Sequence, residues 1–113
     1  MSNYTRGAYF ERSVMKQLTA LGFYCVRSAG SHGVFDIIAL LSGAMPLMIQ
    51  CKTDGRVDPE ERASLWRESI KAGAWAVRAR RVNKNTIFDV LNPDQTTWRL
   101  LIPKIYVEKG SFV

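Results

Sequence analysis

Asp36 is a carboxylate in the middle of an apolar stretch, Val34-Phe35-Asp36-Ile37-Ile38-Ala39. Burial of a lone ionised carboxylate is costly, so such a residue needs a partner, a metal ion or a pocket, unless it only caps the loop at the start of a strand. A second polar intrusion follows where Gln50 and Lys52 end the apolar run Leu47-Met48-Ile49. In a strand, residues spaced by two point to one face. These three polar groups are therefore candidates for one shared site.

Glu11 is a fourth candidate, on a segment with helical periodicity. It lies at the edge of an apolar stripe that includes Leu18, where it either reaches the edge of the sheet or remains a solvated flank residue. Two carboxylates, an amide oxygen and a lysine form an oxygen-rich site suited to Mg²⁺ or Mn²⁺. A lysine there can orient or deprotonate a water, while the metal lowers the pKa of that water and neutralises a phosphate.

Four elements must position these residues. Periodicity predicts a helix over Tyr4 to Leu21, ended by a glycine. Strands are predicted over Phe23 to Ser28, Val34 to Leu41 and Met45 to Thr53. The near-continuous apolar character of the second of these strands predicts burial on both of its faces. If the turn of the hairpin is centred near Gly43 or Ala44, Asp36 lies opposite Gln50 or Lys52 and shares a face with them, whereas a shift of one residue would separate them.

The second half of the chain continues the pattern. Asp58 as N-cap, Pro59 and Glu61 predict a helix that runs to Ala72 and stops at Gly73, with an apolar stripe of Ala63, Trp66 and Ile70. Further strands are predicted over Ala74 to Arg80 and Thr86 to Leu91, and one or two more over Thr97 to Val107, interrupted by Pro103. This order predicts a mixed sheet with helices packed on it, the α/β class.

Composition narrows the function classes. The chain has 113 residues with 47% apolar and 23% charged residues, which fits one globular domain and argues against disorder and coiled coil. No secretory signal or membrane-spanning run is apparent, so no membrane partner is expected. Cys25 and Cys51 lack metal-finger spacing and are interpreted as reduced core thiols of a cytoplasm-like compartment.

The net charge of +6 resides entirely in residues 62–84. A one-sided basic stretch on a small domain favours a polyanion partner, most often nucleic acid, although a solvated basic surface is the alternative. The basic residues of this stretch are Arg62, Arg67, Lys71, Arg78, Arg80, Arg81 and Lys84.

The order of these motifs resembles the archaeal-type Holliday junction resolvases of the PD-(D/E)xK nuclease superfamily. Asp36, thirteen further residues and then Gln50-Cys51-Lys52 is a relaxed form of the superfamily signature. The similarity covers about residues 6 to 82, including Glu11-Arg12-Ser13-Val14, Val26-Arg27-Ser28-Ala29-Gly30-Ser31 and Ala72-Gly73-Ala74-Trp75-Ala76-Val77-Arg78. The C-terminal third is not diagnostic.

The resemblance implies a restriction-endonuclease-like mixed β-sheet flanked by helices, as a single nuclease domain over residues 1–113. It implies that Lys52 is the catalytic lysine and that Ser31 lies in a loop near the scissile phosphate, with Ser28 as a rival. The implied cofactor is Mg²⁺, for which Mn²⁺ can substitute. Its expected ligands are Glu11, Asp36, Gln50 and the carbonyl of Cys51.

The implied activity is metal-dependent, structure-selective cleavage of four-way (Holliday) DNA junctions by paired phosphodiester hydrolysis. Two coordinated cuts require two sites, so a homodimer is expected, with Trp98 and Leu100-Leu101-Ile102 packing in the core or at the interface. Residues expected to hold DNA are Arg6, Arg27, Ser31, Arg80 and Arg81. The expected location is the cytoplasm of a prokaryotic cell, or of one in which a virus replicates.

Two departures from the family pattern stand out. Phe35 replaces a proline that shapes the backbone, and Gln50 replaces the second acidic residue. A neutral amide attracts Mg²⁺ less strongly than a carboxylate, so Gln50→Glu is expected to lower the Mg²⁺ requirement. Two alternatives remain open: another PD-(D/E)xK nicking or repair endonuclease, and a non-catalytic DNA-binding module of the same fold.

Overall fold

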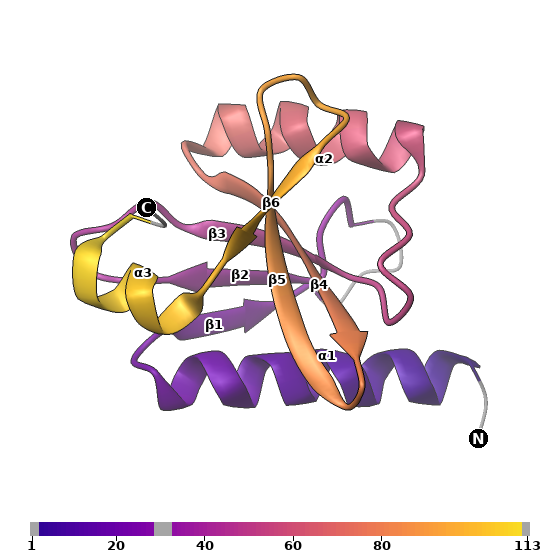
Figure 1. Cartoon of the computed structure of the whole chain (residues 1–113), viewed down its shortest axis with the longest axis horizontal. Coiled ribbons are helices and arrows are strands. Elements are labelled where there is room, and N and C mark those ends of the chain that lie inside the picture. Colours follow the sequence, from indigo (N-terminus) through magenta and orange to yellow (C-terminus); the bar gives the residue numbers. More distant parts are fainter. Residues whose placement is uncertain (1–2, 29–32, 112–113) are drawn as a thin grey trace.

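The computed structural model describes residues 3–28 and 33–111 (Figure 1). The described helices are α1 (Asn3–Ala20), α2 (Pro59–Ala72) and α3 (Pro103–Lys109). The described strands are β1 (Tyr24–Arg27), β2 (Ile37–Leu40), β3 (Leu47–Cys51), β4 (Trp75–Val82), β5 (Asn85–Leu91) and β6 (Trp98–Leu101). None of the described helices has the length and apolar character needed to span a membrane.

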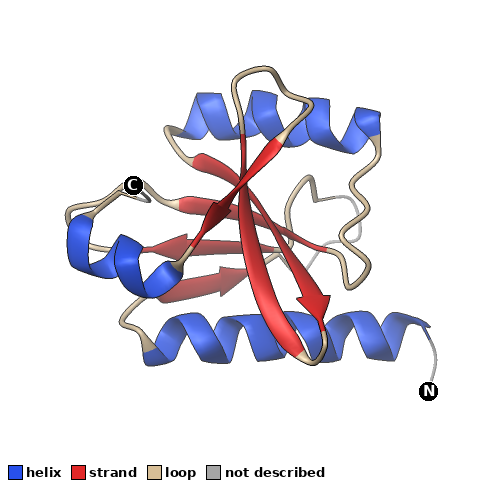
Figure 2. Ribbon diagram, in the orientation of Figure 1, coloured by secondary structure: helices blue, strands red, loops and turns tan. Residues whose placement is uncertain are grey.

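All the described strands form one mixed sheet in the order β1-β2-β3-β4-β5-β6 (Figure 2). Strands β3 and β4 are parallel and are joined through α2, whereas every other neighbouring pair is antiparallel. The mixed α/β class predicted from the sequence is therefore confirmed. In the hairpin of β2 and β3, Ile37 lies opposite Ile49 and Ile38 opposite Met48. This is the even register that the site requires.

The helices cover the two faces of the sheet unequally. Helices α1 and α3 pack on one face over a large apolar cluster that includes Val14, Leu18, Ile49 and Tyr106. Helix α2 packs on the other face, against β3 and β4, over a smaller cluster centred on Leu65. Figure 1 shows α1 and α2 on opposite sides of the strands. The face that carries α2 is therefore only partly covered.

The C-terminal segment corrects one prediction. One or two strands are predicted over Thr97 to Val107, interrupted by Pro103, but only β6 precedes the proline. Residues 103–109 form α3, with Pro103 in its first turn and Gly110 in the left-handed conformation at its end. Proline at this position suits a helix start because its missing N–H has no helical partner to lose. Tyr106 is buried, stacks on Phe23 at 6.2 Å between ring centroids, and donates its hydroxyl hydrogen to the carbonyl of Met45. These long-range contacts hold a helix that is too short to be stable alone.

The apolar stripe predicted for α2 is wrong at Ala63 and Ile70, whereas Trp66 packs against the core cluster and both ends of the helix are confirmed. Leu65 and Ser69 are the buried positions, whereas Ala63 is exposed and Ile70 is 61% exposed. A serine can face the core here because its hydroxyl donates to the sulfur of Met48, at 3.4 Å. The helix is therefore rotated away from the face that the apolar residues indicated.

The strand predicted over Val34 to Leu41 is shorter in the structure and is not buried on both faces. Ile37 and Ala39 are buried against the α1 side, but Leu40 is 39% exposed on the opposite side. The reason is that α2 packs mainly on β3 and β4, so that only Ile38 of β2 reaches the cluster beneath the helix. Val34 and Phe35 lie before the strand and pack at the edge of the α2 cluster.

Candidate active site

Asp36 lies in a bend directly before β2, opposite Gln50 in the continued register of the hairpin. Its N–H donates to the carbonyl of Ile49 at 2.8 Å, which fixes the bend to β3. Its Oδ2 accepts the N–H of Cys51 at 2.7 Å. The main chain of one strand thus holds the carboxylate that begins the other, and the prediction that Asp36 pairs across the hairpin is confirmed.

Glu11 of α1 reaches the same place. Its side chain is 15% exposed, and its Oε2 accepts hydrogen bonds from Arg27 of β1, from Nε at 3.0 Å and from Nη2 at 2.9 Å. The pKa of Asp36 is raised to about 6, mainly by burial and further by the neighbouring Glu11, against the lowering effects of the Cys51 N–H and the Lys52 charge. A buried carboxyl pair of this kind favours either a shared proton or a bound cation.

Cys51 contributes its main chain rather than its thiol. Burial raises the pKa of the thiol, and the nearby Asp36 and Glu11 charges raise it further. A thiol in this environment stays protonated and is neither a nucleophile nor a metal ligand. Both Cys25 and Cys51 are free thiols, as the sequence predicted.

Lys52 follows directly after β3, and its Nζ lies 2.9 Å from Oε2 of Glu61 in the first turn of α2. Burial opposes the ammonium form and is the largest single effect. The hydrogen bond to Glu61 and the negative charges of Glu61, Asp36 and Asp58 together outweigh it, so the pKa of Lys52 is raised. The pKa of Glu61 is lowered because the effect of burial is outweighed by its bonds with Lys52 and with the Asp58 N–H. The pair is therefore fully charged at neutral pH.

Gln50 is buried and faces α2 rather than the carboxyl pair. Its Nε2 donates to the same Oε2 of Glu61, at 3.3 Å. The prediction that the Gln50 side chain joins Asp36 on a shared face is therefore corrected, although the two residues lie opposite each other in the continued register. Sequence reasoning assigned Glu61 only to the start of a helix and missed this role. The relevant signal was present but incomplete: the capping pattern fixed Glu61 in the first turn of α2, but nothing local indicated that this turn returns to the end of β3.

A tight turn makes that return possible. Lys52 begins the turn, and its carbonyl accepts the N–H of Gly55 at 2.8 Å. Gly55 has a φ of +77°, and a Cβ at this position would lie 3.1 Å from Cδ of Arg80. Its carbonyl in turn accepts a hydrogen bond from Nη1 of Arg78 at 2.9 Å. Only glycine combines this conformation with this close approach.

The expected DNA-binding arginines differ in their surroundings. Arg80 is held by Asp89, with Nε 2.6 Å from Oδ2, and Arg78 shares the same carboxylate at 2.9 Å while its guanidinium lies 4.4 Å from the Trp98 ring centroid. Arg81 points away from this network and is exposed. Ser31 lies outside the described residues, as does the side chain of Arg6.

The oxygen donors of the site suit a hard divalent cation that needs only a few protein ligands. Glu11 and Asp36 are adjacent carboxylates, and the pKa of Asp36 is raised. Such a cation would neutralise the negative charge that the two carboxylates share. No three of the His, Cys, Asp and Glu side chains in the described ranges are grouped to hold a metal. Mg²⁺ commonly uses one or two protein carboxylates and keeps several waters, so this set is sufficient for it.

The sequence and fold of this chain are similar to those of known nucleases. The family model described as archaeal Holliday junction resolvase (hjc) matches residues 2–109. The chain belongs to this family. The match extends over the C-terminal third, where the sequence carries no diagnostic motif, and therefore includes α3.

Two members of the resolvase family illustrate the similarity. The crossover junction endodeoxyribonuclease Hjc of Methanocaldococcus jannaschii is 43% identical over 53 residues, which are 47% of this chain and only 38% of that protein. The solved structure of Hjc, a Holliday junction resolvase from the archaeal hyperthermophile Archaeoglobus fulgidus, superposes with a TM-score of 0.62 at 26% identity. It covers 74% of this chain and 70% of that one.

Proposed function

We propose that this protein is a Mg²⁺-dependent endonuclease that resolves four-way DNA junctions by paired phosphodiester hydrolysis. The observation that carries the proposal is the convergence of Glu11, Asp36 and Lys52 at one end of the β2–β3 hairpin. Membership of the resolvase family supports the choice of a branched DNA substrate.

In the proposed mechanism Glu11 and Asp36 would hold the metal, together with the carbonyl of Cys51. When bound, Mg²⁺ supplies charge neutralisation at the phosphate and lowers the pKa of a coordinated water. Lys52 orients the attacking water and offsets the charge that develops on the phosphate oxygens. Arg27 keeps Glu11 turned toward Asp36, because both of its donors to Glu11 meet the same carboxylate oxygen.

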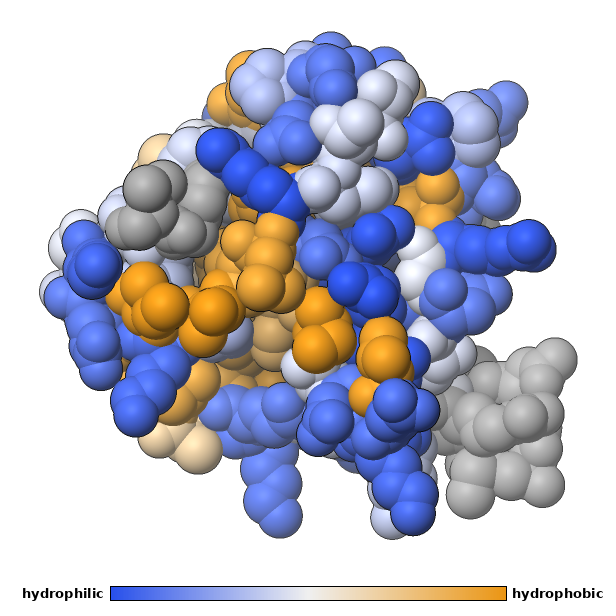
Figure 3. Space-filling model, viewed as in Figure 1, coloured by the Kyte–Doolittle hydropathy of each residue, from blue (hydrophilic) through white to orange (hydrophobic). Residues whose placement is uncertain are grey.

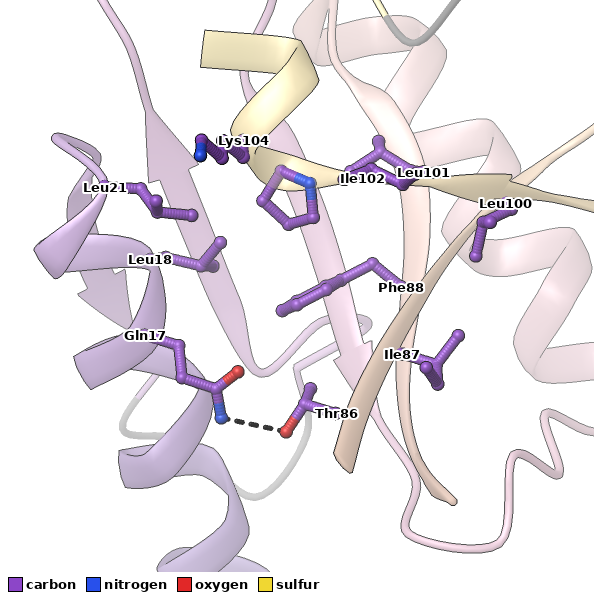
Figure 4. A pocket seen from close by; sticks show the side chains of 11 residues that line it. Gln17, Leu18, Leu21, Thr86, Ile87, Phe88, Leu100, Leu101, Ile102 and Lys104 are labelled. Atoms are coloured by element: carbon purple, nitrogen blue, oxygen red, sulfur yellow. Dashed lines mark hydrogen bonds between the residues drawn. The ribbon is translucent and has the colours of Figure 1, made fainter. Parts of the chain in front are cut away.

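Paired cutting requires a second copy of the chain, and the exposed apolar surface supports this part of the proposal. Leu100 and Ile102 are 54% and 44% exposed at the end of β6. Both line a cavity of about 410 Å³, and Leu18 and Phe88 line its inner wall (Figure 4). Figure 3 shows apolar side chains gathered over the region of β5, β6 and α3.

Cleavage of a synthetic four-way junction tests the proposal. Labelled junction, fork, nicked duplex and linear duplex should be compared at equal concentration, each with Mg²⁺ and with EDTA. We expect two symmetric nicks in the junction with Mg²⁺ and none with EDTA, with much slower cutting of linear duplex. Faster cutting of nicked or linear DNA would favour a repair or nicking endonuclease. Tight binding of the junction without any cut, with Mg²⁺ or Mn²⁺, would favour a non-catalytic module.

A further inference from the structure

Glu61 joins two groups of the candidate site that the mechanism above does not connect. Its Oε2 accepts from Nζ of Lys52 at 2.9 Å and from Nε2 of Gln50 at 3.3 Å. Its Oε1 accepts the N–H of Asp58 at 3.3 Å, in the capping box of α2. Oε1 of Glu61 thus caps the start of α2, and Oε2 binds Lys52 and Gln50.

These contacts lie on the wall of a polar cavity. Gln50 and Glu61 line a space of about 260 Å³ together with Gly33, Val34, Glu60 and Ser64, between the β2–β3 hairpin and the first turns of α2. Lys52 contacts this wall through Glu61, at 2.9 Å. A negative charge on this wall is therefore close enough to orient the ammonium without touching the carboxyl pair.

The identity of residue 50 and the presence of Glu61 depend on each other. The Gln50 amide can donate to the Glu61 carboxylate, but a glutamate at position 50 would bring two carboxylate oxygens to the distance now occupied by a hydrogen bond. Like charges at this separation repel, and neither side chain can donate. The neutral residue at position 50 is therefore the one that fits a helix bearing Glu61.

We propose that Glu61 is a positioning residue for Lys52, and that it supplies from α2 the negative charge that position 50 of β3 lacks. This inference rests on the proposed nuclease function and deepens it. In the described part of the chain, Glu61 forms no metal-binding group with Glu11 and Asp36. It therefore acts through Lys52, by fixing the direction of the ammonium toward the scissile phosphate, and not as a third carboxylate ligand.

An exchange of the two side chains tests the proposal. Glu61→Gln and Gln50→Glu are compared with the double variant, which returns one carboxylate and one amide to the contact in reversed positions. At saturating junction DNA and Mg²⁺, we expect each single variant to lose about tenfold in single-turnover rate, which corresponds to about 1.4 kcal/mol of activation free energy. The double variant should recover to within about threefold of the wild type, with DNA affinity little changed.

Glu60→Gln is the matched control. Glu60 lies in the same turn, lines the same cavity and carries the same charge, but it is exposed and is not part of the contact with Lys52. It should leave the rate within about twofold, so any larger effect of Glu61→Gln is not a general effect of removing a negative charge near DNA. A merely structural role of Glu61 would lower the folded fraction, measured by circular dichroism, and leave the single-turnover rate per folded molecule unchanged.

Two results would overturn the proposal: a Glu61→Gln rate within twofold of the wild type, or a double variant as slow as the product of the two single effects. The same set of variants separates this inference from the proposed function. If the wild type cuts no DNA, the nuclease proposal fails, and urea denaturation midpoints still report the contact. A urea midpoint that recovers in the double variant would show that residues 50 and 61 are energetically coupled. Stability losses that add up in the double variant would show that they are not.

Discussion

Replacement of Asp36 by asparagine should stabilise the metal-free protein at neutral pH. Asparagine keeps the acceptor for the Cys51 N–H and adds a donor toward Glu11, so the main change is the loss of a buried charge. The pKa of Asp36 rises from its ordinary value of 3.8 to about 6, mainly through burial. At about 1.4 kcal/mol per pKa unit this corresponds to roughly 3 kcal/mol. Solvent screening at this half-buried position reduces the expected gain to about 1–2 kcal/mol.

The sign of the pH dependence follows from the raised pKa. The folded state binds the Asp36 proton more tightly than the unfolded state, so deprotonation opposes folding as the pH rises from about 4 to about 6. The cost is fully present above this range and absent below it. The advantage of Asp36→Asn over the wild type should therefore be largest near pH 8 and vanish near pH 3.

Urea denaturation in EDTA, at several pH values, measures this difference. Asp54→Asn removes an exposed carboxylate in the neighbouring turn and serves as the control, with an expected change below about 0.5 kcal/mol. Added Mg²⁺ should raise the stability of the wild type much more than that of Asp36→Asn, which should also lose cleavage while it still binds junction DNA. A wild type at least as stable as the variant at pH 8 in EDTA would refute the reasoning, because the carboxylate would then be solvated without cost.

Three further predictions concern assembly, DNA binding and the C-terminal helix. Leu100→Glu with Ile102→Glu should convert a dimer into a monomer at micromolar concentration in sedimentation velocity, and an unchanged sedimentation coefficient would exclude this surface as the interface. Arg81→Ala should flatten the dependence of log K on log salt by about one, whereas Arg80→Ala should flatten it less because Asp89 already neutralises Arg80. Equal slopes for the two variants would contradict this. Tyr106→Phe should cost about 1 kcal/mol of unfolding free energy, since the carbonyl of Met45 loses its donor, and no change in the urea midpoint would show that water replaces the hydroxyl.

Much of the candidate site was determined by local sequence. The polar residues Asp36, Gln50 and Lys52 interrupt apolar segments. A hairpin turn near Gly43 places Asp36 opposite Gln50, and the period of two in a strand puts Gln50 and Lys52 on one face. The start and end of α2 followed from Asp58, Pro59 and Gly73, whose backbone preferences act within one turn. These features depend only on neighbours along the chain, so the sequence alone was sufficient to predict them.

The tertiary structure decided what depended on distant partners. Residues 103–109 have no strong helical signal of their own and become α3 because Tyr106 packs on Phe23 and bonds to Met45. The basic stretch predicted that Arg80 would be available to DNA, but β5 places Asp89 beside it.

The contacts of Gln50 and Lys52 with Glu61 also depend on residues that are distant along the chain. They span about ten residues of sequence and depend on the turn at Gly55, which returns the first turn of α2 to the end of β3. The sequence by itself determined which residues are polar, which face of a strand they share and where α2 begins. Only the packing of α2 against the sheet decided which carboxylate Lys52 contacts, because ion pairs and hydrogen bonds depend on distances in space that no local pattern specifies.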